Sequence, residues 1–123
     1  MKKYKDLIVH YESWQYECCG TPFKVGDVVQ WTAYKDGDEY WYDAHANFKL
    51  QIEGKIVEIV ALYRTVIGDI NSFRVLGERI ESITDSESAF DLYETQTDLD
   101  SNTEREDFYC YIVNLVDVKI SEK

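Results

Sequence analysis

The chain has 123 residues, of which 45% are hydrophobic and 15% aromatic, and its formal net charge at pH 7 is −11. This length fits one domain with a single core, spanning residues 1–123, and the apolar content excludes a disordered chain. No apolar run is long enough to cross a membrane, and the run Leu7–Val9 is too short for a secretion signal. We therefore expect a cytoplasmic protein that does not contact membranes.

The negative charge is concentrated in one segment of the sequence. Residues 81–107 contain ten acidic residues and one arginine, whereas residues 1–80 contain twelve acidic and ten basic residues. Affinity for nucleic acids depends on basic side chains that neutralise phosphates, and this chain offers few of them. We therefore expect no direct binding to DNA or RNA.

The N-terminal third predicts two strands joined by a turn. Residues 6–14 are rich in β-branched and aromatic side chains and contain no Gly or Pro, which predicts the first strand. Residues 18–26 contain two Gly and the only Pro of the chain, which predicts a connection. Residues 28–34 predict the second strand, and the Asp-Gly-Asp sequence of residues 36–38 predicts the turn that ends it.

The middle of the chain contains the strongest strand signal. Residues 39–47 fit either a short strand or an aromatic loop. Residues 48–65 alternate between apolar and polar side chains, and the alternation changes phase around Gly54. A phase change beside a glycine predicts a β-bulge, which bends a strand.

The second half predicts short strands around one long loop. Residues 67–72 predict a loop, and residues 73–77 and 79–83 predict two short strand pieces. Residues 84–107 predict an acidic loop insertion, because they are polar and carry most of the negative charge. Residues 108–120 predict the final strand.

These elements together predict an all-β protein with almost no helix. Short strands separated by regularly spaced turns favour a small five- to six-stranded, partly open barrel, either SH3-like or OB-like. The long acidic loop would be an insertion in this single domain.

Three cysteines, Cys18, Cys19 and Cys110, are the candidate nucleophiles and soft metal ligands. Adjacent cysteines form only a strained disulfide, so in a reducing compartment we expect three free thiols. The thiols could combine with His10 or His45 as a zinc site or a catalytic pair, but the usual zinc-ligand spacings do not occur. We therefore expect no metal, no cofactor and no catalytic residue, with a Cys/His-dependent enzyme or metal site as the alternative.

Tyr40, Trp41 and Tyr42 are consecutive, so they cannot all point inward from a strand. At least one ring should be partly exposed, where it can stack on a ligand or on a partner's side chain. The alternative is that the rings alternate between core and rim without a binding role. The predicted ligand- or partner-binding rim consists of Trp14, Cys18, Cys19, Tyr40, Trp41, Tyr42 and His45.

The acidic segment is either a solvated surface or a surface that presents negative charge to a basic partner. Its carboxylates lack the apolar surroundings that raise a carboxyl pKa for acid catalysis. The predicted acidic partner surface consists of Asp85, Glu87, Asp91, Glu94, Asp98 and Asp100.

The sequence contains no Gly-rich phosphate loop, no nucleophile elbow and no zinc-binding helix motif. We therefore predict a non-enzymatic binding or regulatory module that engages a protein partner or a small ligand through the aromatic and cysteine rim and the acidic loop. Besides the Cys/His alternative above, an acidic inhibitor or immunity-like protein that occupies a basic site on its partner also fits the charge.

The segment from Trp14 to Trp31 contains two of the three tryptophans and two of the three cysteines. Its part from Trp14 to Asp27 reads W-Q-x-x-C-C-G-x-x-F-x-V-G-D and resembles the signature of an uncharacterised family of small bacterial proteins. The later segment from Gly54 to Ile59 is similar to a G-x-[IV]-x-x-I pattern in the same family. The resemblance implies a domain of unknown function, and it supplies neither an activity nor a catalytic residue.

Overall fold

The computed structural model describes residues 2–44, 50–69, 72–88 and 104–122, with only the backbone described for residues 2–5, 17–19 and 69. Six strands and one short helix make up the named elements of these ranges. In chain order they are β1 (Lys2–Glu12), α1 (Ser13–Cys19), β2 (Val28–Asp36), β3 (Glu39–Tyr42), β4 (Leu50–Asp69), β5 (Ser72–Ile83) and β6 (Arg105–Glu122).

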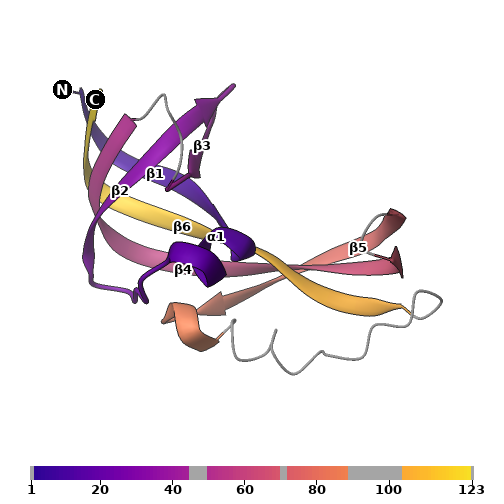
Figure 1. The fold of residues 1–123 in the computed structure, drawn as a ribbon. Coiled ribbons are helices and arrows are strands. Elements are labelled where there is room, and N and C mark those ends of the chain that lie inside the picture. Colours follow the sequence, from indigo (N-terminus) through magenta and orange to yellow (C-terminus); the bar gives the residue numbers. More distant parts are fainter. Residues whose placement is uncertain (1, 45–49, 70–71, 89–103, 123) are drawn as a thin grey trace.

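The six strands form one mixed sheet that curls into an incomplete ring (Figure 1). The strand order is β2-β3-β1-β6-β4-β5, and an additional pairing of β2 with β4 joins five of the strands in a ring. All pairings are antiparallel except that of β1 with β3, which contains only the pairs Val9↔Tyr40 and His10↔Trp41. The prediction of an all-β, partly open barrel is confirmed, whereas the choice between SH3-like and OB-like forms stays a prediction.

The β4–β5 hairpin extends beyond the ring together with the start of β6 (Figure 1). β4 pairs with β5 from Ile59↔Ile83 to Asp69↔Ser72, and on its other side with β6. Within the described ranges, β4 is the only strand that pairs with β5, so β5 forms an edge of the sheet. Nearly every residue of β5 is exposed.

The predicted β-bulge of β4 lies at Val57, three residues after Gly54, because β4 pairs Ile56 with Leu115 and Glu58 with Asn114. Beside Gly54 the pairing also shifts, but the extra residue there belongs to β6. A Cβ atom on Gly54 would lie 3.1 Å from side-chain atoms of both Leu115 and Val118. Glycine therefore allows β6 to pass close to β4 where β4 bends.

The first predicted strand is too long at its C-terminal end. β1 ends at Glu12, and the next seven residues form α1 instead of a continued strand and turn. Gln15 and Tyr16 are both buried in this helix, and the ring of Tyr16 packs edge-on against that of Tyr111. This packing outweighs the strand propensity of the aromatic residues, because propensity is a weak preference beside burial.

The predictions for the region around β5 also need correction. The two predicted pieces are one continuous strand, and most of the predicted loop of residues 67–72 belongs to the ends of β4 and β5. The pieces looked separate because the register shifts between Thr65 and Val66 of β4, which leaves Leu76 of β5 as an extra residue. The predicted acidic loop is shorter than expected, since β6 begins at Arg105; residues 89–103 lie outside the described residues.

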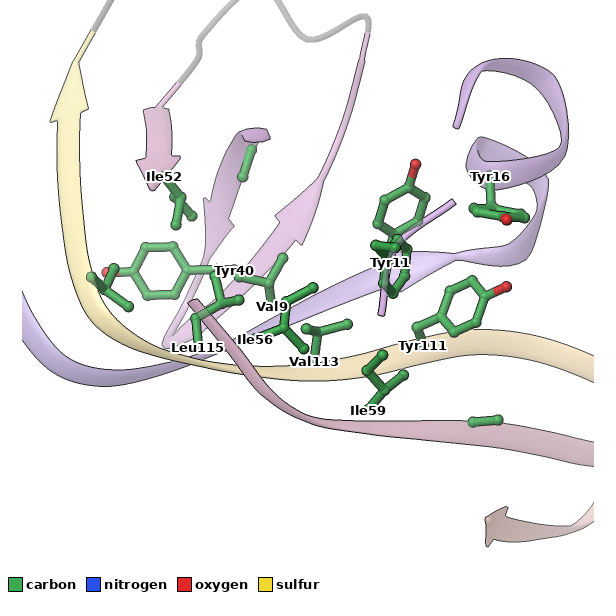
Figure 2. Close-up of a cluster of buried hydrophobic side chains, with 14 of the residues drawn as sticks. Val9, Tyr11, Tyr16, Tyr40, Ile52, Ile56, Ile59, Tyr111, Val113 and Leu115 are labelled. Atoms are coloured by element: carbon green, nitrogen blue, oxygen red, sulfur yellow. The ribbon is translucent and has the colours of Figure 1, made fainter. Parts of the chain in front are cut away.

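The core fills the interior of the ring (Figure 2). Aliphatic side chains occupy its middle, with Tyr40 at one end of them and the tyrosines near α1 at the other. The largest fully buried side chains include Tyr11, Tyr63 and Tyr111. Each large ring contributes more buried apolar area than an aliphatic residue, so the tyrosines supply much of the core of this small domain.

Ser86 is a fully buried polar residue that joins three parts of the chain. Its Oγ accepts a hydrogen bond from the backbone N–H of Phe23 at 2.9 Å and lies 3.0 Å from the hydroxyl oxygen of Tyr16. The hydroxyl of Tyr111 donates to the carbonyl oxygen of Ser86 at 2.6 Å. The residue thus holds α1, the connection after it and β6 together.

We predict that Ser86→Ala lowers the free energy of unfolding by about 1–3 kcal/mol, because it leaves the buried N–H of Phe23 without its acceptor. Urea unfolding followed by circular dichroism measures this change. Ser82→Ala, at an exposed position of β5, is the matched control and should change stability by less than about 0.5 kcal/mol. Equal effects of the two substitutions would contradict a structural role for the Ser86 hydroxyl.

Candidate functional site

Four aromatic side chains meet at the α1 end of the ring. The rings of Tyr11 and Tyr42 are stacked, with centroids 4.0 Å apart and planes within 6°. Trp31 packs edge-on against Tyr11 at 5.3 Å and against Phe23 at 5.2 Å. These residues come from β1, β3, β2 and the connection after α1, so closing the ring is what brings them together.

An open hollow of about 510 Å³ lies against these four rings, and we call it the aromatic pocket. Tyr11 and Phe23 are buried, whereas Trp31 and Tyr42 are only partly buried and offer ring surface to a ligand. Among the described residues, Asp27 is the one charged side chain that lines the pocket. Its other polar lining residues are Thr21, Gln30, Thr32 and Gln51.

A second hollow of about 240 Å³ adjoins the aromatic pocket and shares Pro22, Phe23 and Asp27 with it. The remaining lining residues are Lys24, Asp85 and Glu87. Three carboxylates and one ammonium group therefore surround this hollow, which makes it acidic. Asp85 and Glu87 belong to the acidic surface that the sequence predicted, and they lie beside the aromatic pocket.

Backbone hydrogen bonds fix the segment that separates the two hollows. The N–H of Val25 donates to the carbonyl oxygen of Thr84 at 2.9 Å, and the N–H of Gly26 donates to that of Ile56 at 2.8 Å. Gly26 has a φ of 99°, which L-residues with side chains rarely adopt. The pocket wall is therefore held by β4 and by the residues that follow β5.

The hydroxyl of Tyr11 stays neutral at any physiological pH. Desolvation by burial raises its pKa far above the ordinary value of 10.0, and the neighbouring Tyr42 raises it further. The described lining of the pocket contains one carboxylate together with amides and hydroxyls, and it contains no basic side chain. This composition suits an apolar or cationic group better than an anion.

The outer face of the ring carries a different arrangement around His10. Trp41 stacks on the imidazole of His10, with ring centroids 4.6 Å apart, and Oε2 of Glu39 lies 3.4 Å from Nε2 of His10. His10 and Glu39 border a hollow of about 420 Å³ that is also lined by Asp6 and Asn114. In the part of the chain that the structure describes, Oδ1 of Asn114 is buried without a hydrogen-bond partner. This outer hollow is therefore rich in acceptors and negative charge.

We predict that His10 titrates below its ordinary pKa of 6.5, because desolvation by burial lowers the pKa more than the Glu39 carboxylate raises it. The native state then favours the neutral imidazole, so this contribution to stability is complete above pH 6.5 and is lost as the pH falls. NMR titration of the imidazole protons measures the pKa. Glu39→Gln should lower it further, whereas Glu58→Gln on the exposed side of β4 should not; a rise with Glu39→Gln would contradict this assignment.

The structure distributes the predicted rim residues over separate places. Tyr42 lines the aromatic pocket, Tyr40 is buried and borders the outer hollow, and Trp41 lies outside the ring on His10. Trp14 is 53% exposed on α1, where its Nε1–H donates to the carboxylate of Glu12 at 2.9 Å. Seven of the residues predicted for the rim and the acidic surface have side chains that the structure does not describe: Cys18, Cys19, His45, Asp91, Glu94, Asp98 and Asp100.

Sequence reasoning missed three residues of the aromatic pocket, namely Tyr11, Phe23 and Trp31. Two of them lie inside the segment that holds most of the rare residues of the chain, and this concentration was the available signal. Their convergence depends on the pairing of β2 with β4, which no local pattern encodes.

Residues 5–117 match DUF6578, described as a family of unknown function. The chain belongs to this family. No curated protein and no solved structure matches the chain. The predicted signature of DUF6578 and its bacterial origin stay predictions.

Gly20 of this DUF6578 chain has no room for a side chain. A Cβ atom at this position would lie 2.6 Å from the hydroxyl oxygen of Tyr11 and 2.7 Å from Cα of Tyr16. Its φ of −83° is an ordinary value, so the close approach of the two tyrosines is what requires glycine. The glycine after the cysteine pair therefore allows α1 to pack on the aromatic cluster.

We predict that Gly20→Ala lowers the free energy of unfolding by about 1–3 kcal/mol, because the added methyl group overlaps Tyr11 and the backbone of Tyr16. Thermal unfolding measures the loss. Gly77→Ala is the control, since a Cβ atom there meets nothing within 4 Å. A wild-type stability for Gly20→Ala would show that α1 does not pack on Tyr11 as described.

The one cysteine side chain that the structure describes is unsuited to nucleophilic chemistry. Cys110 is buried, and desolvation raises the pKa of its thiol to about 12, so the reactive thiolate is scarce at neutral pH. Among the described residues, no group of three or more His, Cys, Asp and Glu side chains could hold a metal ion. No helix in the same ranges is long and apolar enough to cross a membrane.

Proposed function

We propose that this member of DUF6578 is a non-enzymatic binding module that holds a basic segment of a partner protein. One side chain of the partner enters the aromatic pocket, and a neighbouring basic side chain lies against Asp85 and Glu87. The observation that carries the proposal is that an aromatic hollow and an acidic one share three lining residues, Pro22, Phe23 and Asp27.

The aromatic pocket supports a cationic or mixed apolar and cationic ligand. The faces of tryptophan and tyrosine attract lysine and arginine side chains, and they also pack against the methylene groups of those residues. Trp31 and Tyr42 offer such faces, and Asp27 supplies a carboxylate beside them. An anionic ligand would find no basic side chain among the described residues that line this pocket.

The charge of the chain supports the same class of partner. The net charge of −11 attracts basic molecules and raises their rate of association, most strongly at low ionic strength. The outer hollow adds the carboxylates of Asp6, Asp38 and Glu39 on another face. A basic partner is thus favoured at long range as well as in the pocket.

We predict that the purified protein selects peptides with a fixed lysine or arginine from a random library over peptides with glutamate at that position. Trp31→Ala should weaken binding of the selected peptide roughly tenfold to a hundredfold, because it removes one of the two partly exposed rings of the pocket. Fluorescence anisotropy of the labelled peptide measures the affinity. Trp14→Ala, which removes an exposed tryptophan outside the pocket, is the control.

A charge-reversal pair separates the acidic hollow from the general negative charge. Glu87→Lys changes the charge beside the aromatic pocket, and Glu58→Lys makes the same change at an exposed position of β4. The proposal requires a clearly larger loss of affinity for Glu87→Lys. Equal effects, or equal selection of basic and acidic peptides, would refute it.

An acidic inhibitor of a basic partner is the second candidate, and the concentration of acidic residues in positions 81–107 favours it. Such a protein would bind chiefly through its carboxylates. Its affinity would fall steeply with added salt and would be insensitive to Trp31→Ala. A Cys/His-dependent activity that uses Cys18 or Cys19 stays an alternative for the residues whose side chains are not described.

A further inference from the structure

We propose that β5 is a homodimerisation edge, which pairs antiparallel with β5 of a second copy of this chain. β5 is twelve residues long, and among the described strands it pairs only with β4. As far as the described residues show, its second edge is unpaired, so the backbone presents a row of donors and acceptors there. A long exposed edge of this kind is a template for adding another strand.

The apolar side chains of β5 are unusually exposed for a soluble domain. Ile80 is 67% exposed and Phe73 is 53% exposed, and Val75 and Leu76 are also exposed. Edge strands that remain unpaired normally carry charged residues at such positions, because exposed apolar edges associate. The chain has thus kept an association-prone surface on its one projecting hairpin.

The bulge at Leu76 brings these apolar side chains to one face. Phe73 lies opposite Gly68, Val75 opposite Val66, and Ile80 opposite Leu62. Alternate residues of a strand share a face, so the three β4 partners, which are all even-numbered, lie on one face of the sheet. A residue points to the same face as its cross-strand partner, so the three β5 side chains lie on that face as well. Without the extra residue, Val75 and Ile80 would point to opposite faces, since they are five positions apart.

One antiparallel register matches the faces of two β5 strands and most of their charges. When Val75 lies opposite Ile80 of the second copy, Arg74 lies opposite Glu81 of the second copy. Arg74 and Glu81 share the other face, because their β4 partners Ile67 and Ala61 are both odd-numbered. Opposite charges and apolar pairs that face each other directly stabilise antiparallel strands.

This self-complementarity is the reason for choosing a second copy as the occupant. A two-fold axis makes each contact twice, so the register gives two Arg–Glu pairs and two Val–Ile pairs. The two Glu78 side chains meet on the two-fold axis of this register, where each is offset by Arg64 of its own chain, whose Nε lies 3.7 Å from Oε1 of Glu78. Glu81 already lies 3.0 Å from Arg79 of its own chain. In the dimer, Arg74 of the second copy would lie beside Glu81 together with Arg79, because the side chains of all three residues lie on the same face of the sheet.

The test is sedimentation velocity over a concentration series of the full chain. The wild-type protein should form dimers, and Ile80→Lys should raise the dimer dissociation constant by about tenfold or more. Val57→Lys is the matched control, because Val57 is 41% exposed on β4 but lies outside the hairpin. Circular dichroism checks that each variant is folded. A wild-type protein that stays monomeric, or equal effects of the two substitutions, would overturn the proposal.

A charge swap tests the register. Arg74→Glu and Glu81→Arg should each weaken the dimer, and the double variant should recover it, because the opposite charges face each other again. A double variant that stays monomeric would overturn this register. Peptide binding by monomeric Ile80→Lys should equal that of the wild type, so this test is independent of the function proposed above.

Discussion

The ring of Tyr11 is the contact on which the arrangement of the chain most depends. It is almost fully buried, and it packs against the rings of Tyr42, Trp31, Phe23, Tyr16 and Tyr111. Those rings come from β3, β2, the connection after α1, α1 itself and β6. One side chain of β1 thus contacts nearly every element that closes this end of the ring. β1 and β3 pair through only two residues of each strand, and the stacking of Tyr11 on Tyr42 adds a side-chain contact between the same two strands.

The candidate site is a consequence of this packing. Trp31 and Tyr42 pack against the core and also line the pocket, where they remain partly exposed. Ser86 and the backbone bonds of Val25 and Gly26 hold the adjoining wall. Rings that are already fixed lose little conformational entropy when a ligand binds. A pocket built on them therefore binds more tightly than one built on a loop that must become ordered.

Local patterns predicted the strands well because each strand alternates along its own length. The phase change predicted a real bulge of β4, which lies at Val57, three residues after Gly54, and the final strand was recognised from its continuous β-branched and aromatic run. The helix α1 escaped prediction, since its residues favour strands and only the burial of Tyr16 against Tyr111 decides its form. β5 was read as two pieces because one bulged residue interrupts the alternation.

The candidate site was predictable only in part. The rule that neighbouring residues of a strand point to opposite faces predicted that Tyr40, Trp41 and Tyr42 would separate, and they do. No local rule connects Tyr11 with Trp31, which lie twenty positions apart and meet through ring closure. Asp85 and Glu87 were recognised by charge alone, and the Lys24↔Asp85 bridge is what brings them to the pocket.

The two proposals use different parts of the molecule and reinforce each other. The aromatic pocket belongs to the closed ring, whereas β5 projects from it (Figure 1). Pairing through β5 leaves the pocket lining untouched, so a dimer would present two aromatic pockets related by a two-fold axis. A partner with two basic segments could then occupy both pockets, and its second segment would bind at a high effective concentration. Modest affinity at each pocket would be sufficient for a stable complex with such a partner.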